Sequence, residues 1–516
     1  MRRQSRFSSR FCLVGQRGGG SLRLVLFSGL FGFLFLGAIA CESSPSSPNI
    51  PDPPDESNEV TFTVLYTNDE HGWMEESAET EGAARLMGLW QSAEGYTSGG
   101  SVLVVSGGDN WTGPAISTWF QGRSMVDVMN AMGYGAAAVG NHEFDFGLPQ
   151  LRDHAAASRF PFLSANIRYR SDNSTPTDQG IERFVIQEIN GIQVGLIGLT
   201  TTRTPSTTKP DNVADFLFLD YETALREVVP EAVAAGAELI VVPGHVCKGE
   251  LTALARQIAD LGVDLLGGGH CNELFAETVG DILLLGGGSS LASYAVARIR
   301  FDTASDTVVA ADLTFRNNIG GAPDPVVESV VRGWQALAEE ALNVIIGYSD
   351  GGVARRSPKM QDLIVESWLQ AYPTADVALT NFGGMRADLP PGEITIADVI
   401  GVMPFDNVIV ELLLTGEQLE AVLRGREENT AIGGMARQSG RWVLDETGQP
   451  LEAGSVYSVL VNDFMYAGGD GYLFAEYDPF GYDTSLNWRQ PVIDWITAQG
   501  SNPANPLDGA LEDLGQ

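Results

Sequence analysis

Basic residues are scarce in this sequence. Its 516 residues include 31 lysines and arginines against 66 aspartates and glutamates, and the formal net charge at pH 7 is -35. Binding to a nucleic-acid polymer requires a basic surface that neutralises phosphates, so this charge argues against sequence-independent binding of that kind. The same charge argues against a small anionic substrate unless positive charge is supplied locally at the site.

The first 40 residues, by contrast, lack acidic side chains altogether. They contain six arginines and end in an apolar run from Leu24 to Ala40. This order is typical of an export signal, to which we assign residues 1–40. A single-pass membrane anchor is the alternative interpretation. It is disfavoured because the run is shorter and richer in glycine than a membrane span of about 20 residues. Without the six positive charges of this segment, residues 41–516 carry -41.

The apolar run ends in Ala38-Ile39-Ala40-Cys41, which resembles the lipobox of bacterial lipoproteins. The resemblance implies cleavage before Cys41 and acylation of that residue. Residues 41–59 are rich in Ser, Pro, Asn and Asp and have the composition of an extended tether. We therefore expect an exported protein of the periplasm or cell surface, anchored to a membrane by lipid at Cys41.

The rest of the sequence alternates short β-branched runs with longer amphipathic stretches, which predicts an α/β architecture. The length is about three times that of a typical domain and favours two domains. We predict a first domain over residues 60–320, a linker over 321–346 with a helix from Pro325 to Ile346, and a second domain over 347–500. Residues beyond 500 are expected to be loosely ordered. The predicted strands are Val60–Tyr66, Val102–Ser106, Phe184–Gly198 with a turn at Asn190-Gly191, Leu239–Val242 and Asp281–Leu285.

Histidine is rare, and its placement is informative. Four of the five histidines lie in short loops that also contain Gly, Asn or Asp, and these loops follow predicted strands or apolar segments. Loops at the carboxyl ends of strands converge in open α/β sheets, so we expect these side chains to meet. Imidazole and carboxylate ligands together are typical of catalytic zinc, manganese or iron sites. The histidines are His71, His142, His154, His245 and His270, and His154 is the one outside such a loop.

The order of these loops resembles a known family. The segments Asp69-x-His71, Gly108-Asp109, Gly140-Asn141-His142-Glu143, His245 and Gly269-His270-x-Asn272 look like the five motifs of the calcineurin-like metallophosphoesterases. Within that superfamily the chain resembles the bacterial 5′-nucleotidase/UDP-sugar hydrolase family. The resemblance implies an N-terminal four-layer α/β/β/α sandwich and a second α/β (α+β) domain that binds the nucleotide.

The same resemblance implies two divalent metal ions, such as zinc or manganese. It places Asp69, His71 and Asn272 on one ion, Asn141, His245 and His270 on the other, and Asp109 as a bridge between them. Asn272 departs from the His or Gln of the family and is shorter than Gln. His142 would donate to developing negative charge, and Asp145 would orient it. For Asp145 the alternative is a capping role in a helix or turn.

The C-terminal half carries the family's nucleotide-binding segments. Asn381-Phe382-Gly383-Gly384-Met385-Arg386, Met403-Pro404-Phe405 and Phe464-x5-Asp470-Gly471-Tyr472 resemble them. Phe405 and Phe464 would stack on a base, or else be core residues. The resemblance also implies contacts from Asp470 to ribose hydroxyls, from Arg386 to phosphate or ribose and from Asn381 to the base. Arg355 would contact the phosphate, although the local sequence around Arg355 departs from the family pattern.

Two cysteines lie close to predicted ligands. Cys247 and Cys271 are each within two residues of a ligand histidine. In an oxidising compartment they could form a disulfide that joins two ligand loops; two buried free thiols are the alternative.

The resemblance as a whole predicts a nucleoside 5′-monophosphate hydrolase with a nucleotide substrate; the sequence does not predict an oligomeric state. The alternatives are a 2′,3′-cyclic-nucleotide phosphodiesterase with 3′-nucleotidase activity, a UDP-sugar hydrolase, a thiosulfohydrolase and a non-catalytic binding lipoprotein.

Overall fold

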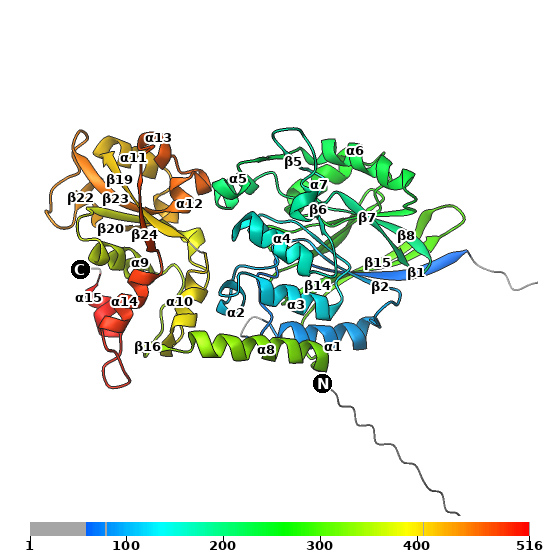
Figure 1. Cartoon of the computed structure of the whole chain (residues 1–516), viewed down its shortest axis with the longest axis horizontal. Helices are drawn as coiled ribbons and strands as arrows, with labels where there is room; N and C mark the ends of the chain where they lie inside the picture. Colours follow the sequence, from blue (N-terminus) through cyan, green and yellow to red (C-terminus); the bar gives the residue numbers. More distant parts are fainter. Residues whose placement is uncertain (1–57, 78–79, 406, 515–516) are drawn as a thin grey trace, which may run out of the picture. The chain divides into compact units, whose positions relative to one another are not determined.

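The computed structural model describes residues 58–77, 80–405 and 407–514 (Figure 1). The predicted export signal, the acylation site at Cys41 and nearly all of the predicted tether lie outside these residues. Among the helices of the described part, none combines the length and apolar character needed to cross a bilayer.

Two sheets form the N-terminal domain. The first has the strand order β15-β14-β1-β2-β3-β4-β6 and the second has the order β12-β13-β11-β10-β8-β7. The first contains β1 (Glu59–Thr67), β2 (Val102–Ser106), β3 (Ala136–Ala138), β4 (Phe162–Leu163), β6 (Ile181–Glu182), β14 (Ser293–Asp302) and β15 (Thr307–Asn317). The second contains β7 (Phe184–Ile189), β8 (Ile192–Ile197), β10 (Leu239–Val242), β11 (Leu265–Gly267), β12 (Leu274–Val279) and β13 (Ile282–Gly287).

Alternating side chains place each sheet between two apolar layers. In β1, Phe62, Val64 and Tyr66 point to the core between the two sheets, whereas Leu65 points to the helices outside. The outer face of the first sheet is covered by α1 (Gly82–Glu94), α3 (Arg123–Met132) and α4 (Gly147–Ala157). The outer face of the second is covered by α6 (Tyr221–Ala234) and α7 (Lys248–Gln257). Figure 1 shows α1 and α3 on one side of the sheets and α6 and α7 on the other, which is the predicted four-layer sandwich.

A five-stranded sheet with the order β20-β17-β23-β19-β24 forms the C-terminal domain. Its faces are covered by two separate apolar clusters, one with α9, α10, α14 and α15 and one with α11, α12 and α13. The strands are β17 (Val377–Asn381), β19 (Val408–Thr415), β20 (Thr430–Gly433), β23 (Val456–Asn462) and β24 (Tyr482–Asn487). The helices are α9 (Pro358–Ala371), α10 (Ile396–Val402), α11 (Gly416–Leu423), α12 (Asp463–Tyr466), α13 (Phe474–Tyr477), α14 (Gln490–Ala498) and α15 (Asp508–Asp513).

The predicted strands and the predicted turn are present, but two predictions were wrong: the end of the linker helix and the loose order of the C-terminal segment. The helix predicted to run to Ile346 is α8 (Pro325–Leu342) and ends earlier, because Ile345–Ser349 form β16 and pair with β18 (Gly392–Thr395). Residues 501–514 are packed on the C-terminal domain and contain α15. Leu511 is buried in the core of the C-terminal domain, and the carboxylate of Asp508 accepts hydrogen bonds from Ser349 and from the backbone N–H of Asp350.

Candidate active site

The five histidine- and aspartate-bearing loops follow parallel strands. Three follow β1, β2 and β3, which pair in parallel in the first sheet, and two follow β10 and β11, which do so in the second. Carboxyl ends of parallel strands lie at one edge of a sheet, and the two edges meet here. One cavity is lined by residues from four of these loops, namely His71, Asp109, Asn141, His142, His270 and Asn272.

Asp109 lies at the centre of this group. Its Oδ2 is 2.9 Å from His245 Nε2 and 3.9 Å from His142 Nε2, and its Oδ1 accepts a hydrogen bond from the backbone N–H of His142 at 2.8 Å. Asn141 Oδ1 lies 3.1 Å from the same His245 nitrogen. Asp109 is 2% exposed and His245 is fully buried, so these groups interact away from bulk water.

The second aspartate, Asp69, is held by hydrogen bonds from its own loop and from the loop that follows β11. Its carboxylate accepts hydrogen bonds from Asn68 Nδ2 at 2.6 Å and from the backbone N–H of His270 at 3.2 Å. Asp69 is 1% exposed, and burial raises its pKa to about 6. Asp69 therefore joins the first ligand loop to the last one.

Left-handed backbone conformations are concentrated among the predicted ligands. Left-handed φ angles occur at Asp69 (51°), His71 (45°), Asp109 (61°), His270 (71°) and Asn272 (56°). Residues other than glycine avoid this region at a cost of about 1–3 kcal/mol each, so the surrounding contacts must hold these loops in place. Five of the seven predicted ligands are thus positioned by a backbone conformation that the sequence did not reveal.

Glu143 supplies several of those holding contacts. Its buried carboxylate accepts hydrogen bonds from the backbone N–H groups of Asp109 (3.0 Å), Asn110 (2.8 Å) and Gly140 (2.5 Å). One side chain thereby fixes the loops that carry Asp109 and Asn141. Glu143 was part of the recognised motif, but no role was predicted for it, because sequence alone does not show which way a carboxylate points.

The site's charges depend strongly on burial. Burial opposes ionisation of Asp109, yet His245 and His142 hold its pKa well below the ordinary value. Burial lowers the pKa of His71 to about 3 and that of His270 to about 4, with Arg386 contributing at His71 and His245 at His270. Burial also opposes protonation of His245, but Asp109 raises its pKa to about 10. Neutral His71 and His270 keep a free lone pair, whereas Asp109 attracts positive charge.

Two groups of these side chains are suited to hold metal ions. Ligand atoms of His71, Asp109 and His142 lie within 4.8 Å of one another, and so do those of Asp109, His245 and His270. The two groups share Asp109, as a bridging carboxylate requires. Imidazole and carboxylate donors suit zinc or manganese.

His142 belongs to the first group by distance but has a different environment from the others. Its Nδ1 lies 2.7 Å from Asp145 Oδ2, its Nε2 lies 3.9 Å from Asp109 Oδ2, and the residue lines the cavity. Burial opposes protonation, but Asp145 and Asp109 raise the pKa of His142. The His142–Asp145 pair predicted from the sequence is therefore formed.

The predicted nucleotide-binding side chains line the same cavity. Asn381, Arg386, Phe405, Phe464 and Asp470 all border it, and its volume is about 260 Å³. Asn381 Nδ2 donates to Asp470 Oδ2 at 2.7 Å. Gly383 and Gly384, from the predicted nucleotide-binding segment, line it as well. The sequence did not predict the other lining residues Thr207, Thr208, Lys209, Asn407, Asn462 and Trp488.

Phe405 lies against the predicted catalytic residue. Its ring stacks on the His142 imidazole with centroids 5.7 Å apart and planes at 23°, and the Arg386 guanidinium lies 5.6 Å from the Phe405 centroid. Aromatic and reactive groups are thus in direct contact. Arg355, by contrast, is outside this cavity; it lines a neighbouring one of about 1070 Å³, and its Nη1 donates to the carbonyl of Arg386 at 3.1 Å.

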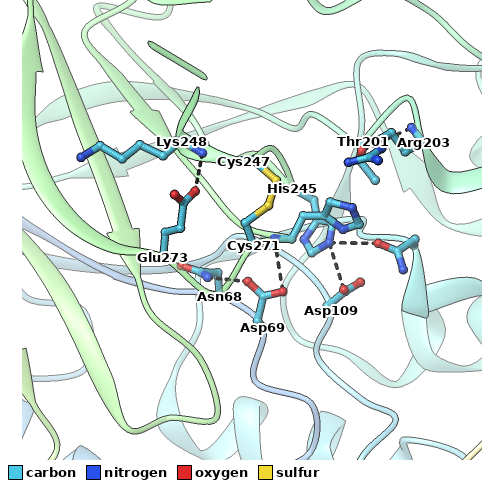
Figure 2. Close-up of a disulfide and its surroundings, with 12 residues drawn as sticks. Asn68, Asp69, Asp109, Thr201, Arg203, His245, Cys247, Lys248, Cys271 and Glu273 are labelled. Atoms are coloured by element: carbon cyan, nitrogen blue, oxygen red, sulfur yellow. Dashed lines mark hydrogen bonds and ion pairs between the residues drawn. A yellow bond between two sulfur atoms is a disulfide. The ribbon is translucent and has the colours of Figure 1, made fainter. Parts of the chain in front are cut away.

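The two cysteines form a disulfide, which excludes the free-thiol alternative. Cys247 and Cys271 are bonded with Cα atoms 5.2 Å apart. Figure 2 shows the bond beside His245, joining the loop after β10 to the loop after β11. His154, the histidine outside the motifs, is 1% exposed and packs against Trp111 with ring centroids 4.3 Å apart.

Comparisons with known proteins agree with this arrangement. Residues 345–476 match the family model described as 5′-nucleotidase, C-terminal domain. The chain is 26% identical to the trifunctional nucleotide phosphoesterase protein YfkN of Bacillus subtilis, with 88% of this chain and 35% of that protein aligned. It is 26% identical to a 5′-nucleotidase of Vibrio cholerae, with 87% and 92% aligned. The chain thus spans about a third of the length of YfkN but nearly the whole length of the Vibrio protein.

A solved structure shares the fold. The 5′-nucleotidase precursor of Thermus thermophilus superposes with a TM-score of 0.72 at 24% identity, covering 86% of this chain and 97% of that one. This shared fold agrees with the C-terminal family match, the similarity to the Vibrio protein and the motif order. Residues 345–476 thus match a 5′-nucleotidase C-terminal domain, and the chain as a whole is similar to 5′-nucleotidases in sequence and shares their fold.

Proposed function

We propose that the protein hydrolyses nucleoside 5′-monophosphates to a nucleoside and inorganic phosphate, using two divalent metal ions. One observation carries this proposal: a single cavity brings together His71, Asp109 and His142 with the aromatic side chains Phe405 and Phe464. A phosphate ester whose alcohol part is flat and aromatic at its far end fits such a lining.

We assign the metal ligands as the resemblance implies. Asp69, His71 and Asn272 would hold one ion, Asn141, His245 and His270 would hold the other, and Asp109 would be shared by both. Two divalent ions bound there would supply Lewis-acid chemistry, neutralising charge on the phosphoryl oxygens and lowering the pKa of the attacking water. This local positive charge overcomes the overall charge of the chain and admits an anionic substrate.

His142 stabilises the negative charge that develops as the ester bond breaks. In the hydrolysis, water forms a new bond to phosphorus, the bond between phosphorus and the 5′ oxygen breaks, and that oxygen takes a proton. Asp145 holds Nδ1 of His142 and favours its protonated form, so Nε2 presents a proton to the developing negative charge. Arg386 contributes a further positive charge beside the phosphate, because its guanidinium lines the cavity.

The C-terminal domain selects the nucleoside. Phe405 and Phe464 stack on the base, Asp470 accepts hydrogen bonds from ribose hydroxyls, and Asn381 contacts the base. The hydrogen bond from Asn381 to Asp470 supports this assignment because it aligns both polar groups at the cavity wall. Thiosulfohydrolase activity is disfavoured, because that reaction does not require a flat aromatic base to stack on Phe405 and Phe464.

A second candidate reaction is the hydrolysis of a UDP-sugar. The neighbouring cavity of about 1070 Å³ is lined by His71, Asn272 and Arg386, which border the first cavity as well. A phosphoryl group between the two cavities could carry a substituent on each side. This arrangement favours a sugar diphosphate over a cyclic nucleotide.

We also propose that the protein is exported and lipid-anchored at Cys41. The Cys247–Cys271 disulfide supports export, because such bonds persist in oxidising compartments. Substitution of Cys41 by Ser should move the protein from the membrane fraction to the soluble fraction. Unchanged membrane association would contradict the anchor.

A substrate panel tests the catalytic proposal. Hydrolysis of AMP, UMP, a 2′,3′-cyclic nucleotide and UDP-glucose is measured with manganese, zinc, cobalt and magnesium in turn, through phosphate release for the two monophosphates and through formation of the nucleoside monophosphate for the other two. We expect the highest kcat/KM for a 5′-monophosphate. Fewer than about one bound divalent ion per chain under metal-replete conditions, with no phosphate release, would instead indicate a binding protein.

A further inference from the structure

The carboxylate of Asp145 has two partners, one on each oxygen. Oδ2 lies 2.7 Å from His142 Nδ1, and Oδ1 accepts a hydrogen bond from Thr208 Oγ1 at 2.9 Å. Thr208 is 2% exposed, so water cannot readily replace its hydroxyl. The Thr208 hydroxyl therefore fixes the rotation of the carboxylate that in turn orients His142.

The neighbours of Thr208 contact both parts of the site. On one side, the carbonyl of Thr207 accepts a hydrogen bond from Asn141 Nδ2 at 3.0 Å, which turns Asn141 Oδ1 toward His245. On the other side, Lys209 Nζ donates to Asp463 Oδ2 at 2.7 Å. The segment 207–209 thus contacts a predicted metal ligand, the predicted catalytic pair and the C-terminal domain.

The contact with the C-terminal domain lies close to Phe464, which with Phe405 forms the predicted base clamp. Asp463 is buried, immediately precedes Phe464, and accepts a hydrogen bond from Asn407 Nδ2 at 2.5 Å. Helix α5 (Thr204–Thr207), which leads into the segment, also packs against the turn Gly469–Gly471 that contains Asp470. The position of Thr208 therefore depends on the domain that selects the nucleoside.

We propose that Thr208 is a positioning residue for the His142–Asp145 pair, and that the Lys209–Asp463 ion pair ties this positioning to the nucleoside-binding domain. The proposal rests on the proposed catalytic role of His142. Removal of the hydroxyl leaves Asp145 Oδ1 without its partner in a buried place, and the carboxylate can then rotate away from His142.

The first test compares Thr208→Val with Thr208→Ser, using phosphate release from AMP. We expect Thr208→Val to lower kcat by about 10- to 100-fold with KM and metal content unchanged, since loss of a supporting hydrogen bond of this kind has effects of that size. Thr208→Ser keeps the hydroxyl and should stay within about threefold of the wild type. Ser206→Ala is the matched control, because that hydroxyl donates to the carbonyl of Arg203 on the same helix and not to the catalytic pair.

A double-mutant cycle separates positioning from general damage. In an Asp145→Asn background, Thr208→Val should change kcat by less than about twofold, because its partner is already altered. Lys209→Met and Asp463→Asn should each lower kcat less than Thr208→Val does, and the double variant should be no slower than the slower single variant. Equal losses for Thr208→Val and Thr208→Ser, additive losses in the cycle, or an unchanged kcat for Thr208→Val would overturn the proposal.

Two further readouts keep this test separate from the nucleotidase proposal. If the wild type hydrolyses p-nitrophenyl phosphate but no nucleotide, the proposed function fails, and the same variants are compared on p-nitrophenyl phosphate. If neither is hydrolysed, ¹⁵N-labelled histidine reports directly on the His142 imidazole, whose signal is assigned with a His142→Ala variant. Thr208→Val should shift the Nδ1–H resonance, and an unshifted resonance would contradict the role of Thr208.

Discussion

The proposed metal-binding loops and the proposed nucleoside-binding wall differ in how their side chains are held. On the metal side, Asp69 and Asp109 are almost fully buried, have left-handed backbone and are fixed by hydrogen bonds from neighbouring loops. On the nucleoside side, Phe405 and Phe464 are only partly buried and lie at the cavity wall. In the first region the position of each side chain depends on hydrogen bonds from the neighbouring loops, whereas in the second each aromatic side chain contributes its own contact with the substrate. A substitution should therefore abolish turnover on one side and weaken substrate binding on the other.

The largest effect is expected at Asp109, which both ligand groups share. Asp109→Asn removes the bridging charge, so bound metal should fall below one ion per chain and kcat/KM for AMP should fall by at least about 10⁴-fold. Metal content is measured by elemental analysis and activity by phosphate release. Asp172→Asn is the control, since that carboxylate accepts local hydrogen bonds from Ser174 in an exposed loop.

Substitution of His142 should separate chemistry from metal binding. His142→Ala is expected to lower kcat by about 10²–10⁴-fold with both metal ions retained, because it removes the proton donor and no predicted ligand. Kinetics and elemental analysis on the same preparation check this. Loss of one metal ion in the variant would mean that His142 is a ligand, as its place in the first ligand group would allow.

The disulfide is expected to stabilise the metal side by restricting the unfolded chain. The bond closes a loop with a sequence separation of 24, so a Cys247→Ser/Cys271→Ser variant should lose about 3 kcal/mol of unfolding free energy. Urea titrations with and without reductant measure this. Reductant should shift the wild-type midpoint and leave that of the variant unchanged; identical wild-type midpoints would argue against a bonded pair in solution.

The smallest effects are expected on the nucleoside wall. Phe464→Ala should raise KM for AMP by about tenfold with kcat nearly unchanged, since stacking on one base contributes about 1–3 kcal/mol. Phe405→Ala should also lower kcat, because Phe405 packs on His142. Phe480→Ala, at a side chain that is 91% exposed, is the control. Unchanged KM in both single variants would rule out the base clamp.

Much of the fold and the composition of the site follow from local sequence. The strands β2 and β10 were predicted with their observed limits, and the strand-ending loops meet as parallel topology requires. These features repeat along the chain and depend on alternation and turn residues. The Cys247–Cys271 pairing was one of two open alternatives, because spacing alone does not bring two loops together.

The features that sequence did not predict depend on contacts between distant segments. The segment after residue 500 is short and rich in polar residues, yet Leu511 is buried because it packs into the core of the C-terminal domain. Glu143 and Thr208 act through hydrogen bonds whose partners lie 33 and 63 residues away. Burial of a polar side chain and the direction in which it points are properties of the packed chain, so no local pattern indicates them.

The central proposal is that the metal ions and the nucleoside meet in a single cavity lined by both domains. A crystal structure of His142→Ala with manganese and AMP tests it most directly. We expect two ions sharing Asp109, the phosphate beside them, and adenine stacked on Phe464. A single ion that does not contact Asp109, or AMP bound outside this cavity, would contradict the proposal.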